Sequence, residues 1–183
     1  MKSVLISTRP KWVEKIVNGE KTIEVRKTAP KEVPFKCYIY ETKGQYVKFT
    51  HGAHTKYGYG RGKVIGEFIC DKVYSIKNRG SSFSVADEEQ SVTNEIARQS
   101  CLYYDDMVSY FGNKDGFGWH ISDLKIYDKP RELSEFSRPC SYSGLCFSCK
   151  RTSFKKDGNL LCNTKITRPP QSWMYVEDLG EEE

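Results

Sequence analysis

A change of hydrophobic period near the N-terminus constrains the fold more than any other feature of the sequence. Apolar residues from Trp12 to Val17 recur at the spacing of one helix face, and Gly19 then supplies a C-terminal stop. From Thr22 to Arg26 the pattern alternates strictly, so Glu24 and Arg26 share one side of a strand. The sequence therefore predicts a short helix that leads directly into a strand, with two charged residues on one face of that strand.

The remaining predicted elements are short and mixed in type. Strands are expected over the apolar runs at residues 4–7, 35–41, 63–76 and 116–127. Gly66, inside one of these runs, indicates a bulge or a close backbone approach. The apolar spacing over residues 92–111 predicts one or two helices, and the polar stretch at 81–91 predicts an exposed connection. Because strands and helices interleave without regular alternation, the pattern favours an α+β fold around a curled sheet or barrel.

The length of the chain fits one domain. We expect a single domain over residues 1–183, with a Cys-rich insert at 137–168 and an acidic tail at 177–183. No apolar run is long enough to predict a membrane span, and the run at residues 4–6 is too short for a signal peptide. We therefore expect a cytoplasmic protein that does not contact membranes.

The positive charge is concentrated in the first half of the chain. Residues 1–80 hold 17 Lys and Arg against 7 Asp and Glu, whereas residues 81–128 hold 3 against 9. A basic surface attracts phosphate and raises encounter rates with nucleic acid. The bias predicts a nucleic-acid or nucleotide partner, and the alternative is a basic face that only keeps the protein soluble.

The segment between the predicted helix and strand carries a family resemblance. Residues 19–26 read G-x-K-x-x-E-x-R, which resembles the signature of the ASCH family. The flanking segments 7–12 and 118–124, with Pro130 and Leu133, are similar to the phage and bacterial members of that family. The resemblance covers most of residues 1–136. It implies a PUA-like small β-barrel flanked by helices, with a cleft beside the motif that binds RNA or a nucleotide.

The motif residues have chemistry that suits such a cleft. Lys21 offers a point charge for phosphate, and Arg26 offers a planar fork for phosphate or a base edge. Glu24 lies two residues from Arg26 and is close enough to share a polar network with it. We count Lys21, Glu24 and Arg26 as candidate nucleic-acid contacts, together with Arg9 and Lys11. The alternative for the Glu24–Arg26 pair is a scaffold ion pair that contacts no ligand.

The segment at residues 46–63 mixes aromatic and cationic residues between glycines. Aromatic rings stack on bases while cations follow the phosphate backbone, so the mixture is typical of single-stranded nucleic-acid binding. Tyr57, Tyr59 and Arg61 are the best candidate contacts. A flexible hairpin tip with no ligand is the alternative.

Two enzymatic alternatives remain open, both of them hydrolases. Some small members of the family remove the acetyl group of N(4)-acetylcytidine with the motif lysine, a threonine three residues later and an acidic residue from the following helical region. Here the lysine is Lys21, but the threonine position holds Glu24, which lacks the hydroxyl nucleophile. Lys21 and Glu24 remain the catalytic candidates. The acidic partner is open among Glu95, Asp105 and Asp106.

The second enzymatic alternative is a ribonuclease. Its only sequence support is the neighbouring pair His51 and His54, which lies in the glycine-rich segment. Binding is therefore the leading interpretation, and a protein-interaction accessory domain is a third possibility.

Four cysteines near the C-terminus have metal-ligand spacing. Their pattern is Cys140-x5-Cys146-x2-Cys149-x12-Cys162, set among turn-forming residues with little apolar content. Four thiolates complete a tetrahedral site, which predicts a structural zinc ion; free thiols or an iron–sulfur cluster are the alternatives. The three other cysteines fall in predicted strands or helices and are expected to be small core residues. They are Cys37, Cys70 and Cys101.

Overall fold

The computed structural model describes residues 1–51, 54–80, 82–140, 152–154, 160–162 and 164–180. The first half of the chain forms β1 (Lys2–Thr8), α1 (Pro10–Val17), β2 (Ile23–Arg26), β3 (Phe35–Glu41), β4 (Gly44–His51), β5 (His54–Gly60), β6 (Val64–Cys70) and β7 (Val73–Asn78). The second half forms β8 (Phe83–Val85), α2 (Gln90–Ser100), α3 (Tyr104–Phe111), β9 (Gly116–His120), β10 (Ser122–Arg131), η1 (Leu133–Glu135), β11 (Thr152–Phe154), β12 (Leu160–Cys162) and β13 (Trp173–Val176). The predicted α+β class is confirmed.

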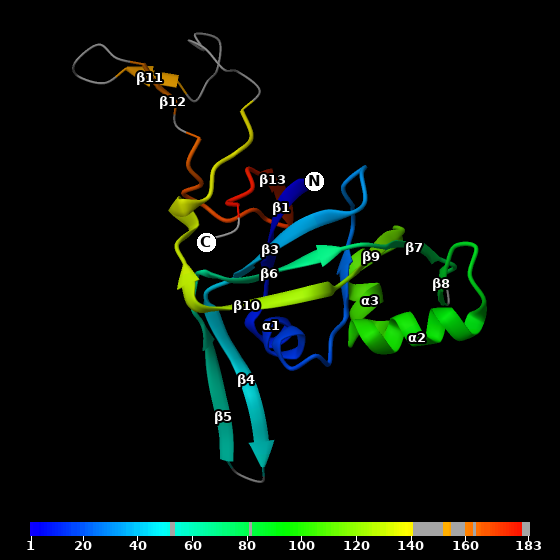
Figure 1. Cartoon of the computed structure of the whole chain (residues 1–183). Helices are drawn as coiled ribbons and strands as arrows, with labels where there is room; N and C mark the ends of the chain where they lie inside the picture. The colour runs from blue at the N-terminus through cyan, green and yellow to red at the C-terminus, as the bar shows by residue number, and fades with distance from the viewer. Residues whose placement is uncertain (52–53, 81, 141–151, 155–159, 163, 181–183) are drawn as a thin grey trace.

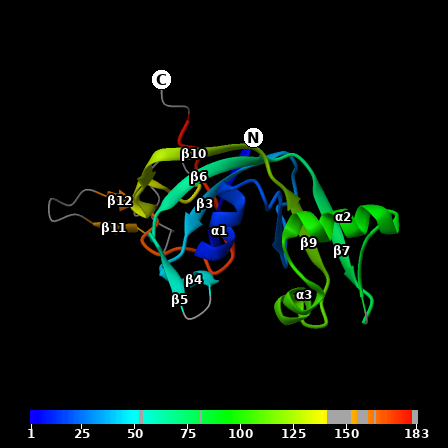
Figure 2. The ribbon, with the colours of Figure 1, turned by 90° about the horizontal axis from the view of Figure 1, so that it is seen from below.

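The strands form two main sheets and two separate hairpins (Figure 1). The five-stranded sheet has the order β10-β6-β3-β1-β13, in which β1 and β3 are parallel and all other neighbours are antiparallel. The four-stranded sheet has the order β2-β9-β7-β8. Seen from below, α1 lies beside the first sheet, and α2 and α3 lie with the second (Figure 2). The prediction of a barrel is corrected, because neither main sheet closes on itself among the described strands.

Two predicted strands each divide between the sheets. The run at 63–76 becomes β6 and β7, and the run at 116–127 becomes β9 and β10. Both bends lie at the same place, where the His120 amide donates to the Lys72 carbonyl at 2.9 Å. Neither bend contains a glycine or a proline. The alternation of apolar and polar residues therefore continues across each bend, and each run was predicted as one strand. Residues 83–85, predicted as part of an exposed connection, instead form edge strand β8.

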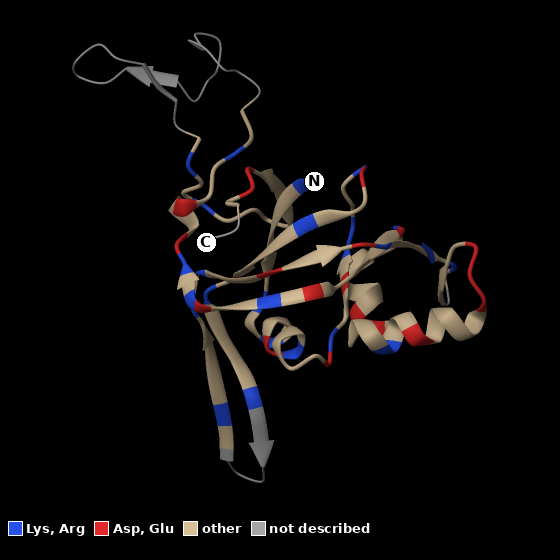
Figure 3. Ribbon diagram, viewed as in Figure 1, with Lys and Arg blue, Asp and Glu red and all other residues tan. Residues whose placement is uncertain are grey.

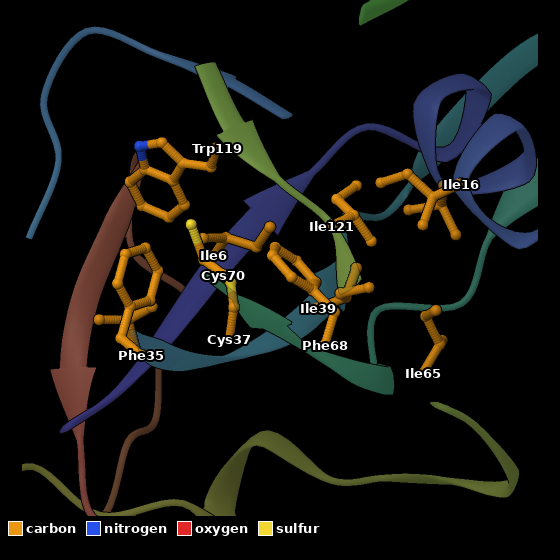
Figure 4. Close-up of a cluster of buried hydrophobic side chains, with 12 residues drawn as sticks. Ile6, Ile16, Phe35, Cys37, Ile39, Ile65, Phe68, Cys70, Trp119 and Ile121 are labelled. Atoms are coloured by element: carbon orange, nitrogen blue, oxygen red, sulfur yellow. The ribbon is translucent and has the colours of Figure 1, made fainter. Parts of the chain in front are cut away.

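The core between the five-stranded sheet and its covering elements is aromatic and aliphatic (Figure 4). Phe35 packs edge-to-face on Trp119, with 5.0 Å between the ring centroids. Cys37 and Cys70 are buried in this core, as predicted, and burial raises the pKa of the Cys70 thiol to about 12. The predicted close approach at Gly66 is confirmed, because a Cβ there would lie 2.4 Å from the Lys125 carbonyl oxygen.

The Cys-rich segment leaves and rejoins the body at one place. Ser137 pairs with Lys165, and the Arg138 amide donates to the Thr164 carbonyl at 2.9 Å. The chain then returns through β13, which pairs antiparallel with β1 as its register from Ser3 to Ile6 shows. The C-terminal part of the chain is therefore an integral part of the main sheet.

Candidate functional site

A cavity of about 580 Å³ lies where the end of β1, the start of α1, β2 and α3 meet. Segment 169–171, which precedes β13, completes its wall. The structure therefore brings together pieces from the two ends of the chain and its middle. The predicted site residues among its lining side chains are Arg9, Lys11, Lys21, Glu24 and Arg26.

Lys21 lines the cavity but is turned into the protein. Its side chain is 3% exposed, and its ammonium donates to the Ile23 carbonyl at 2.8 Å and the Ser100 carbonyl at 2.7 Å. Burial lowers the pKa of this ammonium, and the nearby Glu24 carboxylate opposes that effect. Two of the three ammonium donors are thus used by backbone oxygens, which leaves Lys21 little capacity to grip a phosphate directly.

Glu24 and Arg26 form a buried ion pair beside Lys21. Arg26 Nη2 lies 2.8 Å from Glu24 Oε1, and Glu24 Oε2 lies 3.6 Å from Lys21 Nζ. Oε2 is buried and accepts no hydrogen bond from the described residues. The predicted polar network between Glu24 and Arg26 is therefore present, and one carboxylate oxygen in it remains unsatisfied.

Arg26 connects β2 to two other parts of the chain. Its guanidinium donates to the carbonyls of Ser7 and Ser172, at 3.0 and 3.1 Å, and to the Thr8 hydroxyl at 3.2 Å. These bonds hold the end of β1 and the segment before β13 against β2. The predicted alternation of β2 is present, since Glu24 and Arg26 pair with each other while Ile23 and Val25 pack together in a hydrophobic cluster, and all four strand residues are buried.

Two exposed cationic side chains and one tryptophan ring line the side of the cavity that faces solvent. Arg9 and Lys11 are exposed, and Trp12 is half-buried between them and the interior. The Lys11 ammonium lies 4.1 Å from the centre of the Trp12 ring, and the Lys21 ammonium lies 5.5 Å from it. The side chains able to meet a phosphate in solvent are therefore Arg9 and Lys11.

Helix α3 contributes three lining residues, of which the sequence analysis named only Asp106, as a possible acidic partner of Lys21. Asp106, Ser109 and Tyr110 all line the cavity. Burial raises the pKa of the Tyr110 hydroxyl, which also has the Ser172 side chain as a hydrogen-bond partner. Among the three acidic candidates, Asp106 lines the cavity, whereas Glu95 pairs with Arg98 on α2. The spacing of Asp106 and Tyr110, one helical turn apart on α3, was the available signal.

Comparisons with known proteins identify the domain. The family model of the ASCH domain matches residues 6–129, more than half of the chain. The chain belongs to the ASCH family. The comparison with curated proteins found no match.

Solved structures support this ASCH assignment at the level of the fold. The crystal structure of ASCH from Zymomonas mobilis aligns with a TM-score of 0.55 at 18% identity, covering 96% of this chain and 88% of that one. A tyrosine-to-phenylalanine mutant of that protein gives a TM-score of 0.54 at 16% identity, with 97% and 91% covered. At such identities the likeness shows the fold alone.

The other predicted contacts of this ASCH domain lie outside the cavity lining. Tyr57 and Tyr59 are exposed on β5, one strand of the two-stranded sheet β4–β5. Arg61 follows that strand, and its backbone amide donates to Glu41 Oε2 at 2.8 Å. The segment predicted as a glycine-rich loop is therefore a hairpin. The side chains of His51 and His54 lie outside the described part of the structure.

The zinc prediction for the ASCH domain stays a prediction. Cys146 and Cys149 lie outside the described residues, as does the side chain of Cys162, while Cys140 is described and exposed. Within the described ranges no group of three or more His, Cys, Asp and Glu could hold a metal ion. In the same ranges no helix has the length and apolar character needed to cross a membrane. Cytoplasmic localisation also stays a prediction.

Proposed function

We propose that this ASCH domain binds single-stranded RNA and holds one nucleotide in the cavity beside the motif. The observation that carries the proposal is the lining of a single cavity by exposed cations, aromatic rings and a buried unsatisfied carboxylate oxygen. A volume of about 580 Å³ is in the range of pockets that enclose small ligands. Membership of the ASCH family supports RNA as the class of ligand.

The charges of the site favour an anionic ligand. Lys21 and Arg26 are buried with one carboxylate, Glu24, so the ionised cluster carries a net positive charge. Arg9 and Lys11 add two exposed cations at the same cavity, where they can reach phosphate oxygens. We assign them the phosphate contacts that the sequence had also given to Lys21 and Arg26.

The remaining lining groups suit a nucleobase. Trp12 and Tyr110 supply ring faces for stacking. Glu24 Oε2 supplies an acceptor without a hydrogen-bond donor among the described residues, which complements an amino group on a base edge. A base inserted beside Glu24 would therefore give a hydrogen bond to an oxygen that has only the Lys21 ammonium, at 3.6 Å, nearby.

The salt dependence of RNA binding tests this proposal. We expect a fluorescently labelled single-stranded RNA to bind at low salt, and an Arg9→Ala/Lys11→Ala variant to bind more weakly. Because each phosphate contact to a single strand contributes about 0.7 to the log–log salt slope, the variant should lower that slope by about 1.4. Lys72→Ala/Lys77→Ala, which changes one lysine just before β7 and one on it, outside the cavity lining, is the matched control and should leave the slope unchanged. Undetectable binding at low salt, or equal slopes in both variants, would refute the proposal.

A hydrolase acting on a modified nucleoside is the second candidate function. It is favoured by the presence in one cavity of Lys21, whose pKa is lowered by burial, with the carboxylates Glu24 and Asp106. We expect any such activity to release cytidine and acetate from N(4)-acetylcytidine, detected by chromatography, and to be lost in Asp106→Asn. The same assay on labelled RNA detects cleavage. Absence of product from both substrates in the wild-type protein leaves binding as the function.

We also propose that Cys140, Cys146, Cys149 and Cys162 hold a structural zinc ion. The spacing supports this, and so does the antiparallel bridge Ser137–Lys165, which joins the two ends of the Cys-rich segment. Metal analysis of the purified protein is expected to find about one zinc per chain, as one tetrahedral site requires. Cys149→Ser should lose the metal, whereas the control Cys101→Ser should keep it. A metal-free protein with an unchanged melting temperature would contradict the site.

A further inference from the structure

The hairpin of β4 and β5, here called the arm, forms a two-stranded sheet of its own. It projects away from the body of the molecule, with α1 near its base (Figure 1). Lys48 on β4 forms an ion pair with Glu14 of α1 at 3.0 Å. Isolated two-stranded hairpins are only marginally stable in water, so an arm of this kind gains from a partner that covers it.

The two faces of the arm differ in character. Tyr46 lies opposite Gly58, and its hydroxyl group has Glu14 of α1 as a neighbour, so this face lies toward the helix. Val47 lies opposite Tyr57, and Gln45 lies opposite Tyr59, which places these four on the other face. There Val47, Tyr57 and Tyr59 are 56%, 50% and 72% exposed. The outer face thus presents an uncovered strip with two tyrosines.

The charge of the arm indicates which kind of ligand could bind to its outer face. The sequence from Thr42 to Gly66 contains five Lys and Arg and no Asp or Glu. In Figure 3 the described part of the arm accordingly carries basic residues on both strands and no acidic ones. Tyr57 and Tyr59 are two residues apart on one strand face, about 6.8 Å along the strand. Single-stranded nucleic acid matches the positive charge and the two tyrosines of the arm, because it is a flexible polyanion whose bases have exposed ring faces.

The arm begins at the edge of the cavity. Thr42 lines the cavity, and β4 starts two residues later at Gly44. At the other strand of the arm, a Cβ on Gly60 would lie 1.9 Å from the Thr42 carbonyl oxygen and 2.5 Å from a side-chain carbon of Pro10. Pro10 lies between the cavity residues Arg9 and Lys11. The root of the arm is therefore packed directly against the cavity rim.

We infer that the ligand is an RNA strand of several nucleotides, with one nucleotide in the cavity and its neighbours stacked on Tyr57 and Tyr59 of the arm. The inference rests on the proposed RNA-binding function and adds the class of ligand: an oligonucleotide rather than a free nucleotide. The cavity then discriminates among bases, while the arm adds affinity that depends little on sequence.

A length series tests the inference. Unlabelled single-stranded RNAs, from a mononucleotide to an octanucleotide, compete with a labelled octanucleotide for the wild-type protein, the Tyr57→Ala/Tyr59→Ala variant, and the control Tyr103→Ala. Tyr103 is an exposed tyrosine on the surface near α3 and does not line the cavity. We expect wild-type affinity to rise with length. The double variant should lose about tenfold or more on the octanucleotide and nothing on the mononucleotide, while Tyr103→Ala changes neither. Melting curves check that all variants remain folded.

Three outcomes separate the possibilities. If affinity does not rise with length, or if the double variant binds the octanucleotide as well as the wild type does, the arm has no such role even though the cavity binds. If Trp12→Ala and Arg9→Ala/Lys11→Ala both leave octanucleotide binding unchanged while the double tyrosine variant abolishes it, the arm binds RNA and the cavity proposal fails. If no RNA of any length competes at low salt, both fail together.

Discussion

Glu24→Ala is expected to lower the free energy of unfolding by about 3–5 kcal/mol, the usual cost of removing one partner from a buried ion pair. Glu24 is the only carboxylate within 4.0 Å of Lys21 or Arg26 among the described residues. Both cations are at most 6% exposed, so neither can turn to water when the carboxylate is removed. Urea denaturation at neutral pH measures the effect. Glu20→Ala, which removes the exposed partner of Lys15, is the control and should change stability little.

The loss in Glu24→Ala should also depend on pH. Burial lowers the pKa of Lys21 in the folded protein, and Glu24 opposes this, so its removal lowers that pKa further. Between the folded and unfolded pKa values, the unfolded chain keeps the proton that the folded chain has released, and stability rises with pH. The deficit should therefore shrink as the pH rises from neutral toward 10. A loss below about 1 kcal/mol at neutral pH, or one that grows with pH, would show that Glu24 does not hold this cluster together.

Trp12→Ala is expected to weaken RNA binding roughly 5- to 150-fold, the equivalent of about 1–3 kcal/mol of base stacking. Unlike a change on the arm, it should weaken the binding of a dinucleotide and an octanucleotide by the same factor, because the cavity holds one nucleotide of either. Competition binding measures both factors. Trp12→Phe keeps a ring and should restore most of the affinity. A Trp12→Ala variant that is folded and binds as the wild type does would exclude Trp12 from the site.

The local part of the fold could be predicted from the sequence. The helix that begins at Pro10, its stop near Gly19 and the strand that ends at Arg26 all follow from neighbouring residues, and the structure confirms them. The division of residues 92–111 into two helices is confirmed for the same reason. Such elements depend on spacing and on turn residues, which the sequence displays directly.

Contacts between distant segments could not be predicted. Lys21 has the charged character of a surface residue, yet it is buried and donates to the Ser100 carbonyl, 79 residues away. Arg26 likewise finds an acceptor at Ser172, 146 residues away. Nothing near these two residues in the sequence indicates which distant segments supply their acceptors. Ser109 and Tyr110 of α3 were missed for the same reason.

The path of the chain around the cavity has a consequence for biosynthesis. Pro169, Pro170 and Gln171 form part of the wall, and Arg26, which is synthesised 146 residues before Ser172, holds them in place through the Ser172 carbonyl. While the ribosome is still adding the Cys-rich segment, the wall formed by residues 169–171 is missing from the cavity. The complete cavity can therefore form only after residues 169–171 have been synthesised and β13 has docked beside β1.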